Sequence, residues 1–178
     1  MTERSGYRRK APLMRGKNVL VSGASSGIGA ATALALSQAG ANVAVGARRA
    51  DRLTQLAKEA PGEILELDLD VTDETSCQDA VAATVDRFGS LDVLVNSAGV
   101  MPNGTVAGAD TSQWRRMVNT NLLGAMYITH ATLPHLLNSA GTVVQVSSTS
   151  GRVVSPRAAA YSATKFGLNA SPRPCARK

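Results

Sequence analysis

The chain has 178 residues, 44% of them hydrophobic, which is enough for one sizeable core and too few to favour two independent domains. Its net charge of +6 comes from the ends, because residues 1–17 hold six basic side chains and one acid, and residues 171–178 hold three basic side chains and no acid. Residues 18–170 keep ten basic and twelve acidic side chains, a balance that argues against a nucleic-acid-binding protein.

The ends and the cysteines set further expectations. We expect residues 1–17 to be a basic, disordered tail, because runs of like charge are usually solvated. Cys77 and Cys175 fit no metal-ligand or redox spacing, which favours reduced, unpaired thiols and no metal site. No apolar run has signal-peptide or membrane-spanning length, so we expect a cytoplasmic protein without membrane contact.

Short apolar runs rich in Val and Leu alternate with longer segments of helical period, a pattern typical of parallel strands joined by crossover helices. Five runs are nearly continuous in hydrophobic residues, as expected for strands covered on both faces. The predicted strands are Asn18–Gly23, Asn42–Gly46, Glu63–Asp68, Leu91–Asn96 and Gly141–Ser147. The predicted helices are Ile28–Gln38, Ala50–Ala60, Asp73–Phe88, Thr111–Leu137 and a last one starting near Ala158.

Residue types at the predicted helix ends agree with these boundaries. Thr72 is a capping residue type in front of the helix that begins at Asp73, where acidic side chains favour the positive end of the dipole. Gly40 and Gly89 follow helices at positions that accept a left-handed conformation. We therefore predict an α/β fold for residues 18–170: a Rossmann-type, doubly wound parallel sheet with strand order 3-2-1-4-5.

A glycine-rich loop connects the first predicted strand directly to a helix. Its residues are Ser22, Gly23, Ala24, Ser25, Ser26, Gly27, Ile28 and Gly29. Glycines here let the backbone turn sharply and approach a pyrophosphate, whose charge is met by free amides and the helix dipole. Ordinary turns also contain glycine, but the position at the first crossover favours a dinucleotide site.

The end of the second predicted strand indicates which dinucleotide binds. A carboxylate there binds the ribose hydroxyls of NAD, whereas a cation accommodates the extra phosphate of NADP. Ala47 stands about where the acid would be, and Arg48 and Arg49 follow it. Because a guanidinium suits a phosphate, we expect NADP(H); the alternative is an arginine pair that faces solvent at a helix start.

Tyr161 and Lys165 lie four residues apart in the last predicted helix and so share one of its faces. A phenol has an ordinary pKa of about 10 and needs a neighbouring positive charge to act as an acid and a base near neutral pH. Such a pair is often only a surface feature, but Ser148 precedes it at the end of the fifth predicted strand, where open parallel sheets bind ligands.

Taken together, these motifs resemble the short-chain dehydrogenase/reductase family. The resemblance covers residues 18–170 and includes Gly23-x3-Gly27-x-Gly29 and Ser148-x12-Tyr161-x3-Lys165. Asn96-Ser97-Ala98-Gly99 matches the family's Asn-Asn-Ala-Gly loop except at Ser97. The resemblance implies an NADP(H)-dependent oxidoreductase that interconverts an alcohol and a carbonyl of a small-molecule substrate, and it implies homo-oligomers among the relatives.

The resemblance also implies roles for single residues. Tyr161 would protonate the carbonyl oxygen, Ser148 would hydrogen-bond it, and Lys165 would hold the nicotinamide ribose. Asn121 would support a water-mediated proton relay; the alternative is a polar residue at a helix irregularity. The implied cofactor contacts are Gly23, Ser25, Ser26, Gly27, Ile28, Gly29, Arg48, Arg49, Asp70, Val71, Asn96, Ala98, Gly99, Tyr161 and Lys165.

Within the family, segments such as Leu133–Leu137 look most like the clavaldehyde dehydrogenases and the NADP-dependent dehydrogenases of 3-hydroxy acids. The resemblance ends after residue 170, and prolines in segment 171–178 cannot continue a helix interior. We expect an aberrant tail there, loss of the family's last strands and a fifth strand at the sheet edge, with a frameshift near codon 170 as the hypothesis. The alternatives are an inactive nucleotide-binding relic or interaction protein and, less favoured, a binder of nucleic acid or membrane surfaces.

Overall fold

The computed structural model describes residues 14–102, 104–154 and 156–170. Within these residues one parallel sheet has the strand order β3-β2-β1-β4-β5, which confirms the predicted doubly wound α/β fold. Its strands are β1 (Asn18–Ser22), β2 (Asn42–Ala47), β3 (Ile64–Asp68), β4 (Val93–Asn96) and β5 (Thr142–Gln145). The helices are α1 (Gly27–Gln38), α2 (Ala50–Glu59), α3 (Glu74–Phe88), α4 (Thr111–Met117), α5 (Gly124–Asn138) and α6 (Ala159–Ala170).

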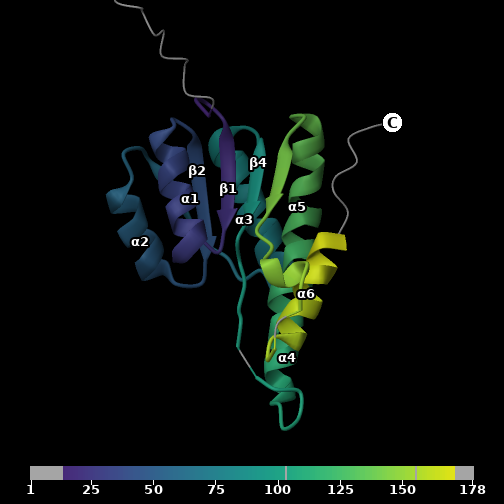
Figure 1. Cartoon of the computed structure of the whole chain (residues 1–178). Coiled ribbons are helices and arrows are strands. Elements are labelled where there is room, and N and C mark those ends of the chain that lie inside the picture. The colour runs from purple at the N-terminus through teal and green to yellow at the C-terminus, as the bar shows by residue number, and fades with distance from the viewer. Residues whose placement is uncertain (1–13, 103, 155, 171–178) are drawn as a thin grey trace, which may run out of the picture.

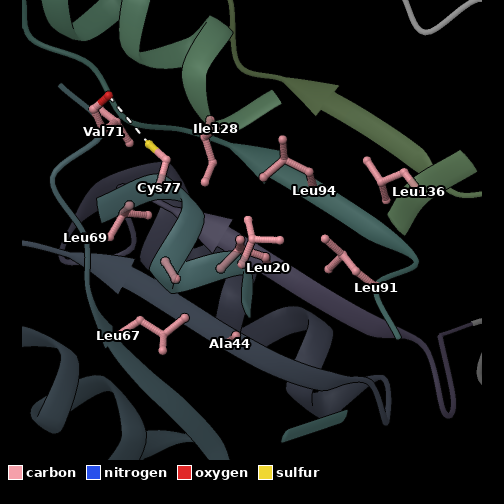
Figure 2. Close-up of a cluster of buried hydrophobic side chains, with 12 residues drawn as sticks. Leu20, Ala44, Leu67, Leu69, Val71, Cys77, Leu91, Leu94, Ile128 and Leu136 are labelled. Atoms are coloured by element: carbon pink, nitrogen blue, oxygen red, sulfur yellow. Dashed lines mark hydrogen bonds between the residues drawn. The ribbon is translucent and has the colours of Figure 1, made fainter. Parts of the chain in front are cut away.

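Helices cover both faces of the sheet (Figure 1). On one face Leu20, Ala44 and Leu94 pack against α3 and α5, as Figure 2 shows for Leu20 and its neighbours. On the other face Val19 and Val21 pack with the buried residues of α1 and α2. Successive residues of β1 therefore enter opposite cores, which explains why its sequence is a continuous hydrophobic run.

The predicted helix ends are mostly confirmed, with one correction. Gly40 and Gly89 have φ of 84° and 80°, the left-handed conformation expected after a helix. The cap of α3 is not Thr72, as predicted, but Asp73, whose carboxylate accepts hydrogen bonds from the N–H groups of Thr75 and Ser76. Thr72 instead donates its hydroxyl to Asp70, because the chain turns once more before the helix begins.

The long helix predicted over Thr111–Leu137 is interrupted. Between α4 and α5 the chain forms a π-type turn, η1 (Val118–Leu123), which contains Asn121. A π-type turn widens the helix by one residue and is frequent at functional sites. The Asn121 side chain is buried there, so this residue does lie at a helix irregularity, and it faces the interior of the molecule.

The buried thiol belongs to the core. Cys77 lies on α3 among the apolar residues of the first cluster, and its sulfur contacts the carbonyl oxygen of Val71 (Figure 2). Burial, with added repulsion from nearby acids such as Asp73, raises the pKa of Cys77 to about 12. It forms no disulfide with any described residue. Cys175 falls outside the described residues.

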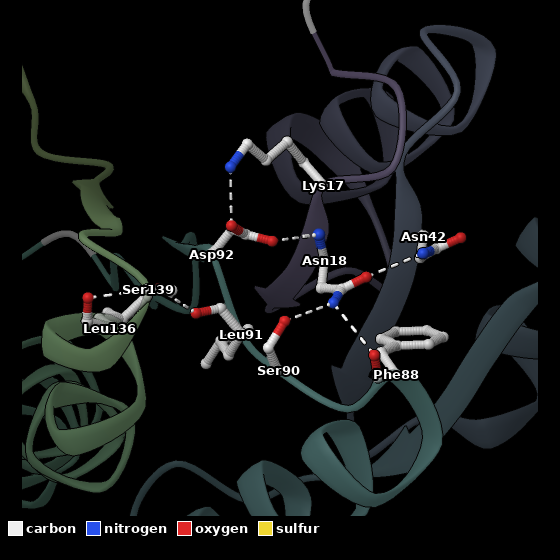
Figure 3. A network of polar contacts seen from close by, with 9 residues as sticks. All are labelled: Lys17, Asn18, Asn42, Phe88, Ser90, Leu91, Asp92, Leu136 and Ser139. Carbon is white, nitrogen blue, oxygen red and sulfur yellow. Dashed lines mark hydrogen bonds and ion pairs between the residues drawn. The ribbon is translucent and has the colours of Figure 1, made fainter.

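The amino ends of the strands are joined by a network of polar side chains (Figure 3). The Asp92 carboxylate accepts from the Asn18 N–H at 2.9 Å and from the Lys17 ammonium at 2.8 Å. The Asn18 side chain donates to Ser90 and accepts from Asn42, at 2.8 Å in both cases. These contacts tie β1 to β2 and to the segment that enters β4.

Several expectations concern chain ends. Nearly all of the predicted basic tail, residues 1–13 of 1–17, and the whole of segment 171–178 lie outside the described residues. The predictions of a disordered tail, an aberrant terminus and a frameshift therefore stay predictions. Among the described strands β5 lies at one edge of the sheet. No described helix has both the length and the apolar character needed to cross a bilayer.

Candidate nucleotide and active site

A cavity of about 590 Å³ opens at the carboxyl ends of the strands. This is the edge where open α/β sheets bind ligands. Twelve residues predicted as cofactor contacts line it: Gly23, Ser25, Ser26, Ile28, Arg48, Arg49, Asp70, Val71, Ala98, Gly99, Tyr161 and Lys165. Gly27, Gly29, Asn96, Asn121 and Ser148 do not, so their places must be described separately.

The glycine-rich loop has the geometry that a pyrophosphate requires. Gly23 has a φ of 68°, and a Cβ there would come within 2.6 Å of the Ala98 backbone, so only glycine lets these two loops meet. Gly27 has a φ of 58° with open space beside it, and α1 begins there without a side-chain cap. Free amides and the positive end of a twelve-residue helix thus face the cavity, which fits a dinucleotide phosphate.

Two arginines, Arg48 and Arg49, line the cavity together with this loop. The Arg49 guanidinium donates to the hydroxyls of Ser25 and Ser26 at 2.9 and 2.8 Å. Arg48 lies 3.6 Å from the Asp70 carboxylate. Both arginines are exposed at the start of α2, as the solvent-facing alternative expected, yet both line the cavity. A hydroxyl pair beside two guanidinium groups fits a phosphate ester.

Asp70 and Val71 form the wall beside Arg48. Burial acts to raise the pKa of Asp70, but hydrogen bonds from the N–H and hydroxyl of Thr72, with the charge of Arg48, hold it below its ordinary value. Val71 is buried against Gly124 at the start of α5, where a Cβ would meet the Val71 side chain at 2.8 Å. The wall therefore pairs an ionised carboxylate with an apolar surface.

Hydrogen bonds of Asn96 and Ser97 hold the end of β4 against the neighbouring strands. Ser22 donates its hydroxyl to Asn96 at 2.7 Å, and Asn96 donates to the Gln145 side chain at 2.9 Å. This buried chain of hydrogen bonds joins β1, β4 and β5. The Ser97 N–H donates to the Ser22 carbonyl at 3.2 Å, and Ser97 itself lines the cavity. Asn96 thus positions the loop rather than contacting the cavity.

Tyr161 and Lys165 lie on α6, and both line the same cavity as the two arginines. The Lys165 ammonium is 5.8 Å from the centroid of the Tyr161 ring. It donates to the Val146 carbonyl at 2.9 Å, and its side chain is almost fully buried. Burial lowers the pKa of Lys165, because water no longer solvates the ammonium.

Asn121 connects the π-type turn to the loop after β4 and to α6. Its amide oxygen accepts from the Val100 N–H at 2.8 Å, and its NH₂ group donates to the Val100 carbonyl and to the Thr164 hydroxyl, at 2.9 and 3.2 Å. Thr164 in turn donates to the Tyr161 carbonyl at 2.7 Å. A Cβ on Gly99 would lie 3.4 Å from the Asn121 oxygen and 3.8 Å from the Lys165 nitrogen, so both residues flank the same glycine.

Ser148, which was expected to contact the substrate, does not line the cavity, whereas Ser147 does. The Ser148 hydroxyl accepts from the Ser150 N–H at 3.1 Å and caps the short turn η2 (Thr149–Gly151). Ser147, one residue earlier, lines the cavity, and its buried hydroxyl has no partner among the described residues. Successive residues of an extended strand point in opposite directions, which separates the two hydroxyls.

Other lining residues were missed by the sequence analysis. Arg116 and Thr120 line the cavity from α4 and η1, and Met101 lines it from the loop after β4. Arg116 and Thr120 are four residues apart, so helical periodicity could have placed them on one face. Periodicity alone does not indicate that this face points toward the cavity.

Comparisons with known proteins agree with this geometry. The family profile described as short chain dehydrogenase matches residues 17–177. Glycine betaine reductase ATRR of Emericella nidulans is 42% identical over 91% of this chain. Trans-4-hydroxycyclohexanecarboxylate dehydrogenase of Sinomonas cyclohexanicum is 38% identical over 85% of it. The structure of an alcohol dehydrogenase from Thermococcus sibiricus, complexed with 5-hydroxy-NADP, covers 86% of the chain with 31% identity and a TM-score of 0.83.

The chain spans only part of these proteins. It covers 13% of the Emericella relative, 62% of the Sinomonas relative and 67% of the Thermococcus chain. The family match nevertheless includes the glycine-rich loop, the loop after β4 and the segment that carries Tyr161 and Lys165. On this match, the chain belongs to the short-chain dehydrogenase/reductase family of oxidoreductases.

Proposed function

We propose that this protein is an NADP(H)-dependent oxidoreductase that interconverts an alcohol and a carbonyl of a small molecule. The observation that carries the proposal is one cavity whose wall contains the Gly23–Ser26 loop, the Arg48–Arg49 pair and the Tyr161–Lys165 pair. Phosphate-binding and proton-transferring groups thus converge on one space. This convergence does not favour an inactive relic.

Different residues of the cavity would bind different parts of the cofactor. The uncapped start of α1 at Gly27 would hold the pyrophosphate, and the arginines with Ser25 and Ser26 would hold the additional phosphate of NADP. Three cationic residues besides Lys165 and a single acid, Asp70, line the cavity, a balance that suits an anionic ligand. When bound, the nicotinamide supplies the hydride donor or acceptor.

The proton steps fall to residues of this chain. In carbonyl reduction the Tyr161 hydroxyl would give its proton to the substrate oxygen as the C–H bond forms, and in alcohol oxidation the phenolate would take it back. The Lys165 ammonium lies 5.8 Å from the Tyr161 ring centroid and would hold the nicotinamide ribose beside the phenol. Ser148 would donate its hydroxyl proton to the substrate oxygen, and accepting from the Ser150 N–H leaves that proton free.

Asn121 would act by holding the site in place. Its three hydrogen bonds join Val100, which lines the cavity, to Thr164 on the helix that carries Tyr161. A substitution of Asn121 would therefore allow the distance between the cofactor-binding wall and Tyr161 to vary. A proton relay through this residue would need a water beside its amide.

Two relatives bear names that suit this reaction type. The Sinomonas relative is named for a ring alcohol that carries a carboxylate, and a relative from Thermotoga maritima, 35% identical, is named for a 3-oxoacyl carbonyl. The Thermococcus structure contains a modified NADP. These names support the alcohol and carbonyl classes and the NADP form of the cofactor.

Turnover in the presence of NADPH tests the proposal. The chain would be mixed with small ketones and aldehydes, and loss of NADPH absorbance would be followed in the wild type and in Tyr161→Phe. We expect Tyr161→Phe to lower kcat by about 10²- to 10⁴-fold, the usual contribution of a general acid, while NADPH binding persists. Equal turnover in both proteins would contradict the role of Tyr161.

A further inference from the structure

A second cavity, of about 320 Å³, adjoins the first through Tyr161, which lines both. Its walls come from the β4–α4 loop, the face of α4 and the segment that leads into α6. Their lining residues include Val106, Asp110, Trp114, Met117 and Arg157. A volume of this size suits a small molecule of a few apolar groups. Tyr161 thus stands between a nucleotide-sized space and a smaller one.

Apart from Thr105, Gln113, Tyr161 and two charged side chains, the residues that line the second cavity are apolar or glycine. Trp114 and the fully buried Met117 lie three residues apart on α4, and the largely exposed Val106 lines the cavity from the loop before it. Thr105 donates its hydroxyl to the Ala107 carbonyl at 2.8 Å, so its donor is already used. The body of a ligand in this space would therefore meet hydrophobic surface.

Two charged side chains line the cavity, and they differ in what they already bind. The Asp110 carboxylate accepts from the N–H and the hydroxyl of Ser112 at 2.9 and 2.8 Å, as the cap of α4. Arg157 is exposed and forms no ion pair with the residues that the structure describes. Asp110 stays ionised, but its oxygens already accept from Ser112, whereas the guanidinium donors of Arg157 are engaged in no described ion pair.

The backbone at Arg157 is held in an unusual conformation. Its φ is 63°, in the left-handed region that L-residues with long side chains seldom adopt. The Gly104 N–H donates to its carbonyl at 3.0 Å, which joins the two loops that form the mouth of the cavity. Such strain persists where the surrounding structure fixes it, and it concentrates at ligand sites.

We propose that the second cavity binds the substrate and that Arg157 selects a substrate carrying a carboxylate. The inference rests on the proposed function, since the alcohol or carbonyl carbon of the substrate must reach Tyr161. The apolar body would lie against Trp114 and Met117, and the planar carboxylate would pair with the guanidinium of Arg157. The substrate class is then a small, largely apolar hydroxy acid or keto acid.

Trp114 makes this testable without turnover, because it is the single tryptophan of the 178-residue chain and it lines the cavity. The full chain would be titrated, with and without NADPH, with cyclohexanecarboxylate and with cyclohexanecarboxamide, while tryptophan fluorescence is followed. Neither probe carries a reacting hydroxyl or carbonyl carbon. We expect the carboxylate to bind about tenfold more tightly than the amide, a modest factor because Arg157 is partly solvated.

Arg157→Gln should remove the preference for the carboxylate, and Arg157→Lys should retain part of it. Arg152→Gln is the matched control, because Arg152 is an exposed arginine of the same loop that lines neither cavity. Equal binding of the two probes to the wild type, no saturable change, or an equal loss in Arg152→Gln would overturn the proposal. Failure of the proposed function would show differently, as absence of NADPH binding and of ketone reduction, whatever the probes do.

Discussion

The two ends of the five strands differ in how completely their polar groups are paired. At the amino ends Lys17, Asn18 and Asp92 form a closed network in which each side chain has a partner within 3.2 Å (Figure 3). At the carboxyl ends α1 begins without a side-chain cap, Ser147 keeps a buried hydroxyl without a described partner, and Lys165 is a buried charge.

This difference indicates that the polar groups at the amino ends of the strands serve stability, whereas those at the carboxyl ends serve function. A buried polar group without a partner costs free energy, and proteins retain such groups where a ligand completes the pairing. The amino ends use their polar residues to hold β1, β2 and the entry of β4 together. At the carboxyl ends the polar groups remain available to bind a nucleotide and a substrate. Changes at the two ends should therefore affect different measurements.

The largest effect is expected for Lys165→Met. Turnover should fall by about 100-fold or more, because the charge beside Tyr161 is lost. The free energy of unfolding should rise by about 1 kcal/mol, since an apolar side chain of similar length replaces a buried ammonium. Chemical denaturation and NADPH-dependent turnover would be measured on the same samples; a stability loss with unchanged turnover would contradict the separation.

The pH dependence of that stability gain has a definite sign. Burial lowers the pKa of Lys165 below its ordinary value of 10.5, so the unfolded chain binds more protons than the folded one between these two values. Wild-type stability should therefore rise relative to Lys165→Met as the pH rises through that window. A gain that stays constant up to pH 10.5 would show that the ammonium carries no burial cost.

A smaller effect is expected for Thr164→Val. The substitution keeps the shape of the side chain but removes the acceptor for Asn121 and the donor to the Tyr161 carbonyl. We expect kcat to fall by about tenfold, equivalent to the loss of about one hydrogen bond, with KM for the substrate little changed. Thr164→Ser keeps the hydroxyl and should retain most of the activity. If both variants lose activity equally, packing rather than hydrogen bonding explains the effect.

The smallest effect belongs to the amino ends. Asp92→Asn should lower the free energy of unfolding by about 1 kcal/mol at pH 7 and leave turnover unchanged. Burial alone would raise the pKa of Asp92, but the Asn18 N–H and Lys17 hold it below its ordinary value of 3.8. Its contribution is therefore present above pH 3.8 and is lost as the pH falls through the lower, folded-state value. Urea denaturation at pH 7 and in acid would reveal a difference that disappears in acid.

The fold could be predicted closely because its signals are local. Val19 to Val21 form a continuous apolar run, and Gly23 and Gly89 mark turns that only particular backbone conformations satisfy. Strand order followed from the crossover pattern rather than from any single residue. The cap of α3 was misassigned by one residue because Thr72 and Asp73 are both good capping types, and the choice depends on the turn at Asp70.

The site could be predicted only where spacing alone fixes it. The Tyr161–Lys165 spacing and the glycine-rich loop needed no tertiary information. Arg157 was not predicted, because its place in the second cavity depends on a left-handed backbone and on the contact with Gly104. Arg116 was missed because helical periodicity places it on a face of α4 but does not indicate that this face lines the cavity.

The preference of the wild-type chain for NADPH over NADH tests the central claim most directly. Both cofactors would be titrated at fixed ionic strength, with binding followed by cofactor fluorescence and by the rise in thermal stability that a ligand of the folded state produces. The account predicts that NADPH binds at least about tenfold more tightly, because Arg48 and Arg49 meet its additional phosphate. Equal binding, or no binding to a folded chain, would contradict the assignment of the carboxyl ends as an NADP(H) site.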